Sequence, residues 1–154
     1  MTEMGSKLVL IVPEILLFVG AVIVAVLGLS GSRAVRGAVP WTTIGFIVAA
    51  IVATQIVYGD GDTVAAAGLL IPKLGLYLKT LVGVIAVGLV LVGTGMVDRR
   101  YEEAVRDGRA GFDPLRVVRG EYHAFLLLSL AGTMLIANAN DLIWLFLATE
   151  LSSL

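Results

Sequence analysis

Charged side chains inside apolar runs are the residues of this sequence best suited to chemistry. Glu150 stands in an apolar stretch that extends from residue 142 to residue 151. An ionised carboxylate at the centre of a bilayer costs roughly 3 kcal/mol or more, and the few that occur there usually carry protons or ions. We therefore favour a functional role for Glu150. The alternatives are a glutamate that only ties helices together, or a segment that does not enter a membrane.

The depth of Glu150 supports this interpretation. At about 1.5 Å of rise per residue, it would lie about 14 Å along a helix from Asp141, close to half of the ~30 Å thickness of a bilayer's hydrocarbon core. Burial there disfavours the charged carboxylate, whereas a nearby cation favours it. A carboxyl group held between these two effects can take up and release a proton, so we expect Glu150 to act in proton translocation.

Lys79 is the other ionisable residue well inside an apolar run. It would lie about 8 Å along a helix from Leu74, and its long side chain makes a Lys79–Glu150 charge pair conceivable. We favour a different interpretation, in which the ammonium group extends to the membrane interface. Glu14 and His123 lie near the ends of apolar runs, and an interfacial position is expected for both, with a proton-relay role for His123 as the alternative.

The composition predicts an integral membrane protein. Of 154 residues, 58% are hydrophobic and only 15% are charged, and the mean hydropathy is +0.98. The absence of cysteine excludes disulfides and thiolate metal sites, and His123 is the only histidine, so we expect no cofactor and no metal in this chain. No basic run interleaved with aromatic residues points to a nucleic-acid partner.

The elements that must position these residues are helices. The apolar runs predict an all-α, polytopic integral membrane protein, since a transmembrane helix needs about 20 mostly apolar residues. Four complete helices are expected, with the start of a fifth, at 8–29, 41–58, 74–97, 117–137 and 142–154.

Features between and beside these helices complete the prediction. Pro40 is expected directly before the second helix, and the apolar segment 64–71 is too short to span, so it is interpreted as interfacial or re-entrant. Asn140 or Asp141 is suited to cap the fifth helix. That helix has 13 residues, fewer than a span requires, so we expect residues 1–154 to be the N-terminal transmembrane part of a longer polypeptide.

The basic residues predict the orientation. Eight of the 11 lysines and arginines lie in the connections after the first and third helices. The positive-inside rule makes that side cytoplasmic. The N-terminus would then lie outside, and the fifth helix would enter from the outer face. Acidic residues are interspersed with the arginines of the connection after the third helix, which we interpret as a solvated topology determinant.

Several segments carry a resemblance to a known family. They read EYHAFLLL at 121–128, LIANANDL at 135–142 and LFLATELSSL at 145–154, with VPEILL at 12–17 and LGLYLKTL at 74–81. Together they resemble subunit N of the proton-pumping NADH–quinone oxidoreductase, the antiporter-like membrane subunit of respiratory complex I. The segments from residue 121 onward are the most specific, and they fit subunit N better than its paralogues L and M.

The resemblance implies a function and a setting. In that family the glutamate that matches Glu150 pairs with a lysine on a later helix and helps to couple quinone reduction to proton translocation. Flavin, iron–sulfur clusters and quinone are expected in partner subunits of the membrane-embedded complex, with none in this chain. A bacterial inner membrane is the expected location, ahead of a thylakoid membrane. Two alternatives remain open: a subunit of a monovalent cation–proton antiporter, and a small structural or assembly membrane protein.

Overall fold

The computed structural model describes residues 3–30, 32–59, 72–93, 99–111, 119–139 and 142–153. Within these ranges the chain forms helices and turns, with no strand. The helices are α1 (Glu3–Leu10), α2 (Val12–Gly28), α3 (Arg33–Gly59), α5 (Pro72–Gly93), α6 (Arg99–Arg106), α7 (Arg119–Ile136) and α8 (Leu142–Ser152). The all-α prediction is thus confirmed for the described residues.

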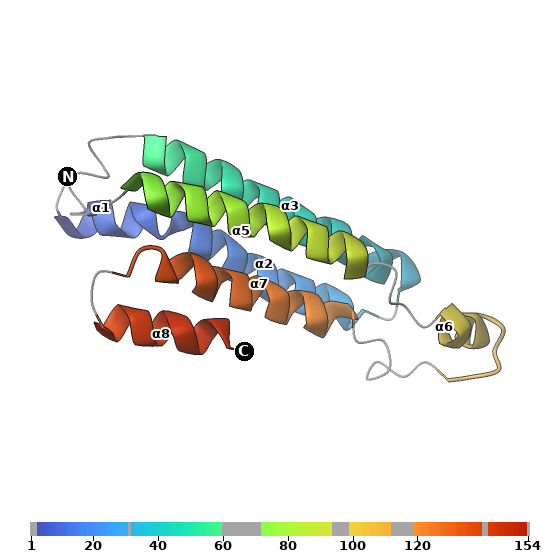
Figure 1. Cartoon of the computed structure of the whole chain (residues 1–154). Coiled ribbons are helices and arrows are strands. Elements are labelled where there is room, and N and C mark those ends of the chain that lie inside the picture. The colour runs from blue at the N-terminus through green and yellow to red at the C-terminus, as the bar shows by residue number, and fades with distance from the viewer. Residues whose placement is uncertain are drawn as a thin grey trace.

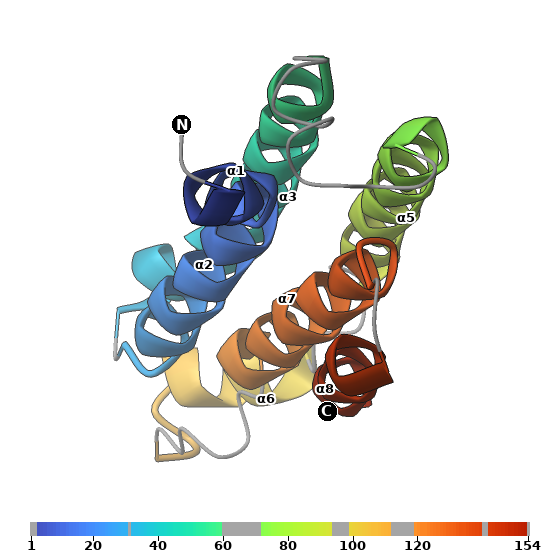
Figure 2. The ribbon, with the colours of Figure 1, turned by 90° about the vertical axis from the view of Figure 1, so that its left-hand side faces the viewer.

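Four long helices form a bundle, which Figure 1 shows from the side. Helix α2 packs against α3 and α7, and α5 packs against the same two helices, so α3 and α7 lie between α2 and α5. Helix α8 packs on α7 outside this group, as the end view in Figure 2 shows. The core between the four helices is apolar and includes the fully buried side chains of Leu17, Val24, Ile47, Val90 and Leu127.

The first predicted helix is two helices. α1 ends at Leu10 and α2 begins at Val12, with a turn at Ile11 between them. Pro13 explains the interruption, because it has no backbone N–H to donate to the carbonyl of Val9 and its ring crowds that carbonyl. The single helix predicted over 8–29 is therefore wrong in its first turn.

The second helix begins earlier than predicted. α3 starts at Arg33, so Pro40 lies inside the helix and not before it. A proline in a helix interior removes one backbone hydrogen bond and crowds the preceding turn, at a cost of about 3 kcal/mol. The turn before Pro40 is nevertheless held in place, because Arg36 donates a hydrogen bond of 2.8 Å from Nη1 to the carbonyl oxygen of Ser30.

The three remaining predicted helices match α5, α7 and α8. The predicted ends at 94–97, 117–118 and 154 lie outside the described residues. So do the segment 64–71 and the proposed caps Asn140 and Asp141. The short polar helix α6 lies in the arginine-rich connection, where no helix was predicted.

The outer surface of the bundle is apolar. The segments Ala34–Gly59 and Lys73–Gly93 are long and apolar enough to cross a membrane by length and composition. Helices α2, α7 and α8 are shorter apolar helices. Large apolar side chains are exposed along the outer faces, among them Val26, Ile56, Val92, Leu142 and Ile143. Soluble monomers rarely expose contiguous apolar surface on this scale.

Glycines allow two close contacts between helices. A Cβ added to Gly28 on α2 would lie 2.3 Å from the Cα of Gly120 on α7, which is too close for any side chain. A Cβ added to Gly132 would lie 2.4 Å from the backbone nitrogen of Ser152, so α8 also approaches α7 closely. Small residues at such crossings are typical of helices that associate in membranes.

Candidate functional site

A buried ion pair between α2 and α5 is the main polar feature of the bundle. Lys79 Nζ lies 2.5 Å from Glu14 Oε1 and donates a hydrogen bond to it. Both residues are almost completely enclosed, Lys79 with 1% and Glu14 with 3% of its surface exposed. The expectation that the Lys79 ammonium reaches the membrane interface is therefore wrong, because this group turns inward to a carboxylate.

Consecutive helices run up and down the bundle in turn, which explains how two residues 65 positions apart in the chain meet. Glu14 lies in the first turn of α2, and Lys79 lies in the second turn of α5. Both helices begin at the same end of the bundle, where α3 and α7 end (Figure 1). Glu14 thus lies near a helix start, as the sequence predicted, but inside the bundle.

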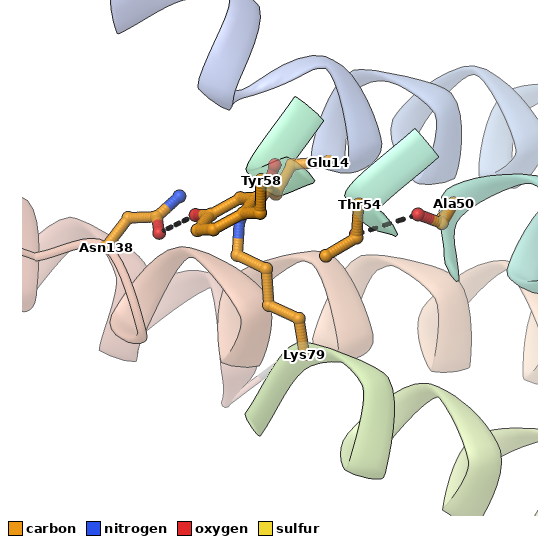
Figure 3. A network of polar contacts seen from close by, with 6 residues as sticks. All are labelled: Glu14, Ala50, Thr54, Tyr58, Lys79 and Asn138. Carbon is orange, nitrogen blue, oxygen red and sulfur yellow. Dashed lines mark hydrogen bonds and ion pairs between the residues drawn. The ribbon is translucent and has the colours of Figure 1, made fainter. Parts of the chain in front are cut away.

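Two further polar residues complete a cluster at this end. Tyr58, in the last turn of α3, lies with its ring centroid 5.0 Å from Lys79 Nζ. Its hydroxyl donates a short hydrogen bond to Asn138 Oδ1, in the turn after α7 (Figure 3). We call Glu14, Tyr58, Lys79 and Asn138 the four-helix polar cluster, since each residue comes from a different helix or its end.

The surroundings of the ion pair are apolar or internally satisfied. Thr54, one turn before Tyr58 on α3, is fully buried, and its hydroxyl donates a 2.8 Å hydrogen bond to the carbonyl of Ala50 (Figure 3). The face of the Tyr58 ring attracts the Lys79 ammonium, because an aromatic ring carries partial negative charge on its face. The Glu14 carboxylate is thus the principal counter-charge of Lys79 in the described part of the chain.

Two buried polar atoms of the cluster have no hydrogen-bond partner in the described structure. They are Oε2 of Glu14 and Nδ2 of Asn138. One is an acceptor and the other a donor, and a water molecule can satisfy both types of group. Buried polar groups are almost always satisfied in folded proteins, so these two atoms mark positions where the cluster can accept a further hydrogen-bond partner.

Glu150 lies apart from this cluster. It is on α8, eight residues or about 12 Å after the first residue of that helix. Its side chain is exposed, whereas Ala148 is buried against the rest of the structure. Because Lys79 pairs with Glu14, the conceivable Lys79–Glu150 pair is not formed in the described residues. The role of Glu150 in proton translocation stays a prediction.

His123 lies near the start of α7, as predicted, but it is buried, with 3% of its surface exposed. Its ring meets that of Tyr122 edge to face, with centroids 5.2 Å apart. This position is near the end of the bundle opposite the four-helix polar cluster (Figure 1). The structure therefore does not bring His123 together with Glu14 and Lys79.

Sequence reasoning missed Glu14 as the partner of Lys79, and it missed Tyr58 and Asn138. One signal was available: in an up-and-down bundle, the first and third helices start at the same end, so their early charged residues come near each other.

Taken together, the fold and the site define a helical bundle with an apolar exterior and one buried charge pair among its described residues. Comparison with known proteins adds the family that the chain resembles. It is 28% identical to NADH-quinone oxidoreductase subunit N of Maricaulis maris, over 98% of this chain. It is 31% identical to subunit N of Methylobacterium nodulans over 92% of the chain, and 28% identical to that of Erythrobacter litoralis over 99%.

These similarities confirm the resemblance to subunit N. The chain spans less than a third of the length of these relatives, 28% of the first, 27% of the second and 29% of the third. No protein-family model matches the chain. No solved structure matches it either.

Proposed function

We propose that this chain is part of a membrane subunit of a proton-pumping NADH–quinone oxidoreductase, in which it helps to couple quinone reduction to proton translocation. The observation that carries this proposal is the similarity of nearly the whole chain to proteins named subunit N of that enzyme. The buried Glu14–Lys79 pair adds weight, since charged residues inside membrane bundles usually serve ion or proton pathways.

We further propose that α2, α3, α5 and α7 cross the membrane, and that α8 enters it. Their exposed faces carry large apolar side chains that suit a hydrocarbon environment. Exposure of these faces to water would destabilise the protein, because each Å² of exposed apolar surface costs about 25 cal/mol relative to burial.

The proposed orientation places the N-terminus outside a bacterial inner membrane. Support comes from the distribution of arginines, because α6 with Arg106, and Arg109 after it, lie at the end of the bundle opposite the four-helix polar cluster (Figure 1). The positive-inside rule assigns that end to the cytoplasm. The cluster would then lie in the outer half of the membrane.

Glu150 is the residue that we propose couples proton translocation to the rest of the complex. It lies on the exposed side of α8, where further parts of a longer subunit can approach it. A lysine brought close would favour the carboxylate, and its withdrawal would favour the protonated acid. The electron-transfer groups, flavin and iron–sulfur clusters, would belong to partner subunits, which also bind NADH and quinone.

Purification of the full-length protein tests this proposal. An affinity tag on the polypeptide should recover flavin- and iron–sulfur-containing subunits from detergent-solubilised membranes, together with NADH–quinone reductase activity. Deletion of its gene should abolish NADH-driven acidification of inverted membrane vesicles. Recovery of antiporter subunits alone, or unchanged NADH-driven pumping after deletion, would contradict the proposal.

A further inference from the structure

We infer that the Glu14–Lys79 pair is a proton-exchange site in its own right, separate from Glu150 and opening toward the end of the bundle where Tyr58 and Asn138 lie. The inference rests on the proposed function, because it assigns the pair to the proton route of a membrane subunit. It adds a site on α2 and α5 that the Glu150 mechanism does not use.

The site consists of two opposite charges inside an otherwise apolar core. A buried ion pair is a weak source of stability, because removing two charges from water costs nearly as much as their attraction returns. Apolar residues of similar size would hold α2 and α5 at least as well. The presence of Glu14 and Lys79 inside an otherwise apolar core therefore points to a role for their charges.

One carboxylate oxygen of Glu14 lies outside the ion pair. Glu14 binds Lys79 through Oε1, while Oε2 is buried and has no hydrogen-bond partner in the described structure. This oxygen can receive a proton from a water molecule without first breaking the ion pair. Asn138 Nδ2 is the other buried atom of the cluster that has no partner in the described structure, and it can donate a hydrogen bond to a water molecule.

The pair is better suited to a proton than to a metal cation. The Lys79 ammonium already occupies one oxygen of the only carboxylate in the cluster, and its positive charge repels a metal cation. Sodium would also need several oxygen ligands close together. Among the described residues no group of three or more His, Asp or Glu side chains is placed to hold a metal ion. The chemistry of the pair therefore favours a proton over a metal cation.

The position of the pair indicates the side from which it is reached. Tyr58 covers Lys79 with its ring, and Asn138, which is only partly buried, holds the Tyr58 hydroxyl. Gly75, one turn before Lys79 on α5, leaves little space beside them: an added Cβ would lie 3.4 Å from Tyr58 Cε1 and 3.8 Å from Asn138 Oδ1. Tyr58 and Asn138 are thus the side chains that lie between the ion pair and the near end of the bundle, so a proton that enters from this end must pass them.

The exchange is a cycle of three proton transfers. A proton that arrives at Oε2 converts the Glu14 carboxylate into a carboxylic acid, which leaves the Lys79 ammonium without its counter-charge. The ammonium then loses its proton and becomes a neutral amine. Transfer of the acid proton from Glu14 to this amine restores the ion pair. One proton enters and one leaves, and no electron is transferred.

The double variant Glu14→Gln with Lys79→Met tests the inference in the full-length protein within its complex. It removes both charges at once, so neither partner is left as an uncompensated buried ion. We expect normal assembly and normal NADH–quinone reductase activity in uncoupled membranes. Proton pumping per electron should fall by about twofold or more, because the substituted side chains cannot exchange a proton. Pumping is measured by dye quenching in inverted vesicles.

Gln55→Leu is the matched control. It removes the 2.9 Å hydrogen bond from Gln55 Nε2 to Thr80 Oγ1, another side-chain contact between α3 and α5 close to the cluster, without removing a titratable group. Pumping per electron should be unchanged in this variant.

The outcomes separate the two proposals. Normal pumping in an assembled complex that carries the double variant would overturn the inference and would mark the pair as a structural contact. If Glu150→Gln still lowered pumping in that case, the proposed function would stand. If the chain were absent from the NADH–quinone reductase, the proposed function itself would fail.

Discussion

Lys79 Nζ and Glu14 Oε1, 2.5 Å apart, join two helices that have α3 and α7 between them. The contact therefore ties together opposite sides of the bundle. It also places a positive and a negative charge among side chains that offer few other polar partners.

Replacement of Lys79 alone should destabilise the protein strongly. Lys79→Met leaves the Glu14 carboxylate buried without its counter-charge, and the loss of one partner of a buried pair costs about 3–5 kcal/mol. The measurements are the amount of protein in the membrane and its thermal unfolding in detergent. Adding Glu14→Gln to Lys79→Met should recover most of the loss. A single variant as stable as the unsubstituted protein would contradict the prediction.

Tyr58→Phe should have a smaller effect. It keeps the ring over Lys79 and removes only the hydroxyl that donates to Asn138 Oδ1. A partly buried acceptor that loses its partner costs about 1–3 kcal/mol. Thermal unfolding in detergent should therefore show a modest loss of stability. Tyr58→Leu, which also removes the ring, should lose more, and an equal loss in both variants would argue against the contact of the ring with Lys79.

Gly132→Val should separate α8 from α7. The added side chain has no room beside the backbone of Leu151 and Ser152, and overpacking of this kind costs about 1–3 kcal/mol. The displacement should also break the 2.7 Å hydrogen bond from Ser129 Oγ to the carbonyl of Ser152. Limited proteolysis of α8 in detergent should become faster. Gly88→Ala is the control, because an added Cβ there would have no atom within 4 Å apart from the adjacent backbone of its own helix.

Glu150→Gln should leave the described fold intact and should lower proton pumping in the full-length protein. The side chain is exposed on α8, so its replacement leaves the buried packing between the described helices unchanged. Assembly, followed on native gels, should persist, while pumping per electron falls. Thr149→Val is the neighbouring control, since the Thr149 hydroxyl bonds only within its own helix, to the carbonyl of Leu145. Wild-type pumping with Glu150→Gln would exclude the proposed role.

The helices could be predicted from the sequence because long apolar runs leave few alternatives to a helix. Their boundaries were harder, since proline has opposite effects in different settings. Pro13 lies where the chain forms two helices, although hydropathy alone predicts one continuous helix there. Pro40, by contrast, lies inside a helix, although it is expected to precede that helix. In both cases the result depends on how the neighbouring turns are held, which hydropathy does not report.

The partner of Lys79 could not be read from local sequence. Its position near a helix start fits an ammonium group at the interface as well as one that turns inward. What decides between them is the presence of Glu14 across the bundle, a contact between residues far apart in the chain. Tyr58 and Asn138 have ordinary interfacial and turn explanations when each is considered alone.

The close crossing of Gly28 and Gly120 has a mechanical consequence. It sets the separation of α2 and α7 at one end by their backbones, whereas the other end of α2 is held by side chains, among them the buried Leu17 and the Glu14–Lys79 pair. A change in the charge of Glu14 would therefore act on contacts between side chains at the near end of α2 and leave the backbone crossing at Gly28 in place.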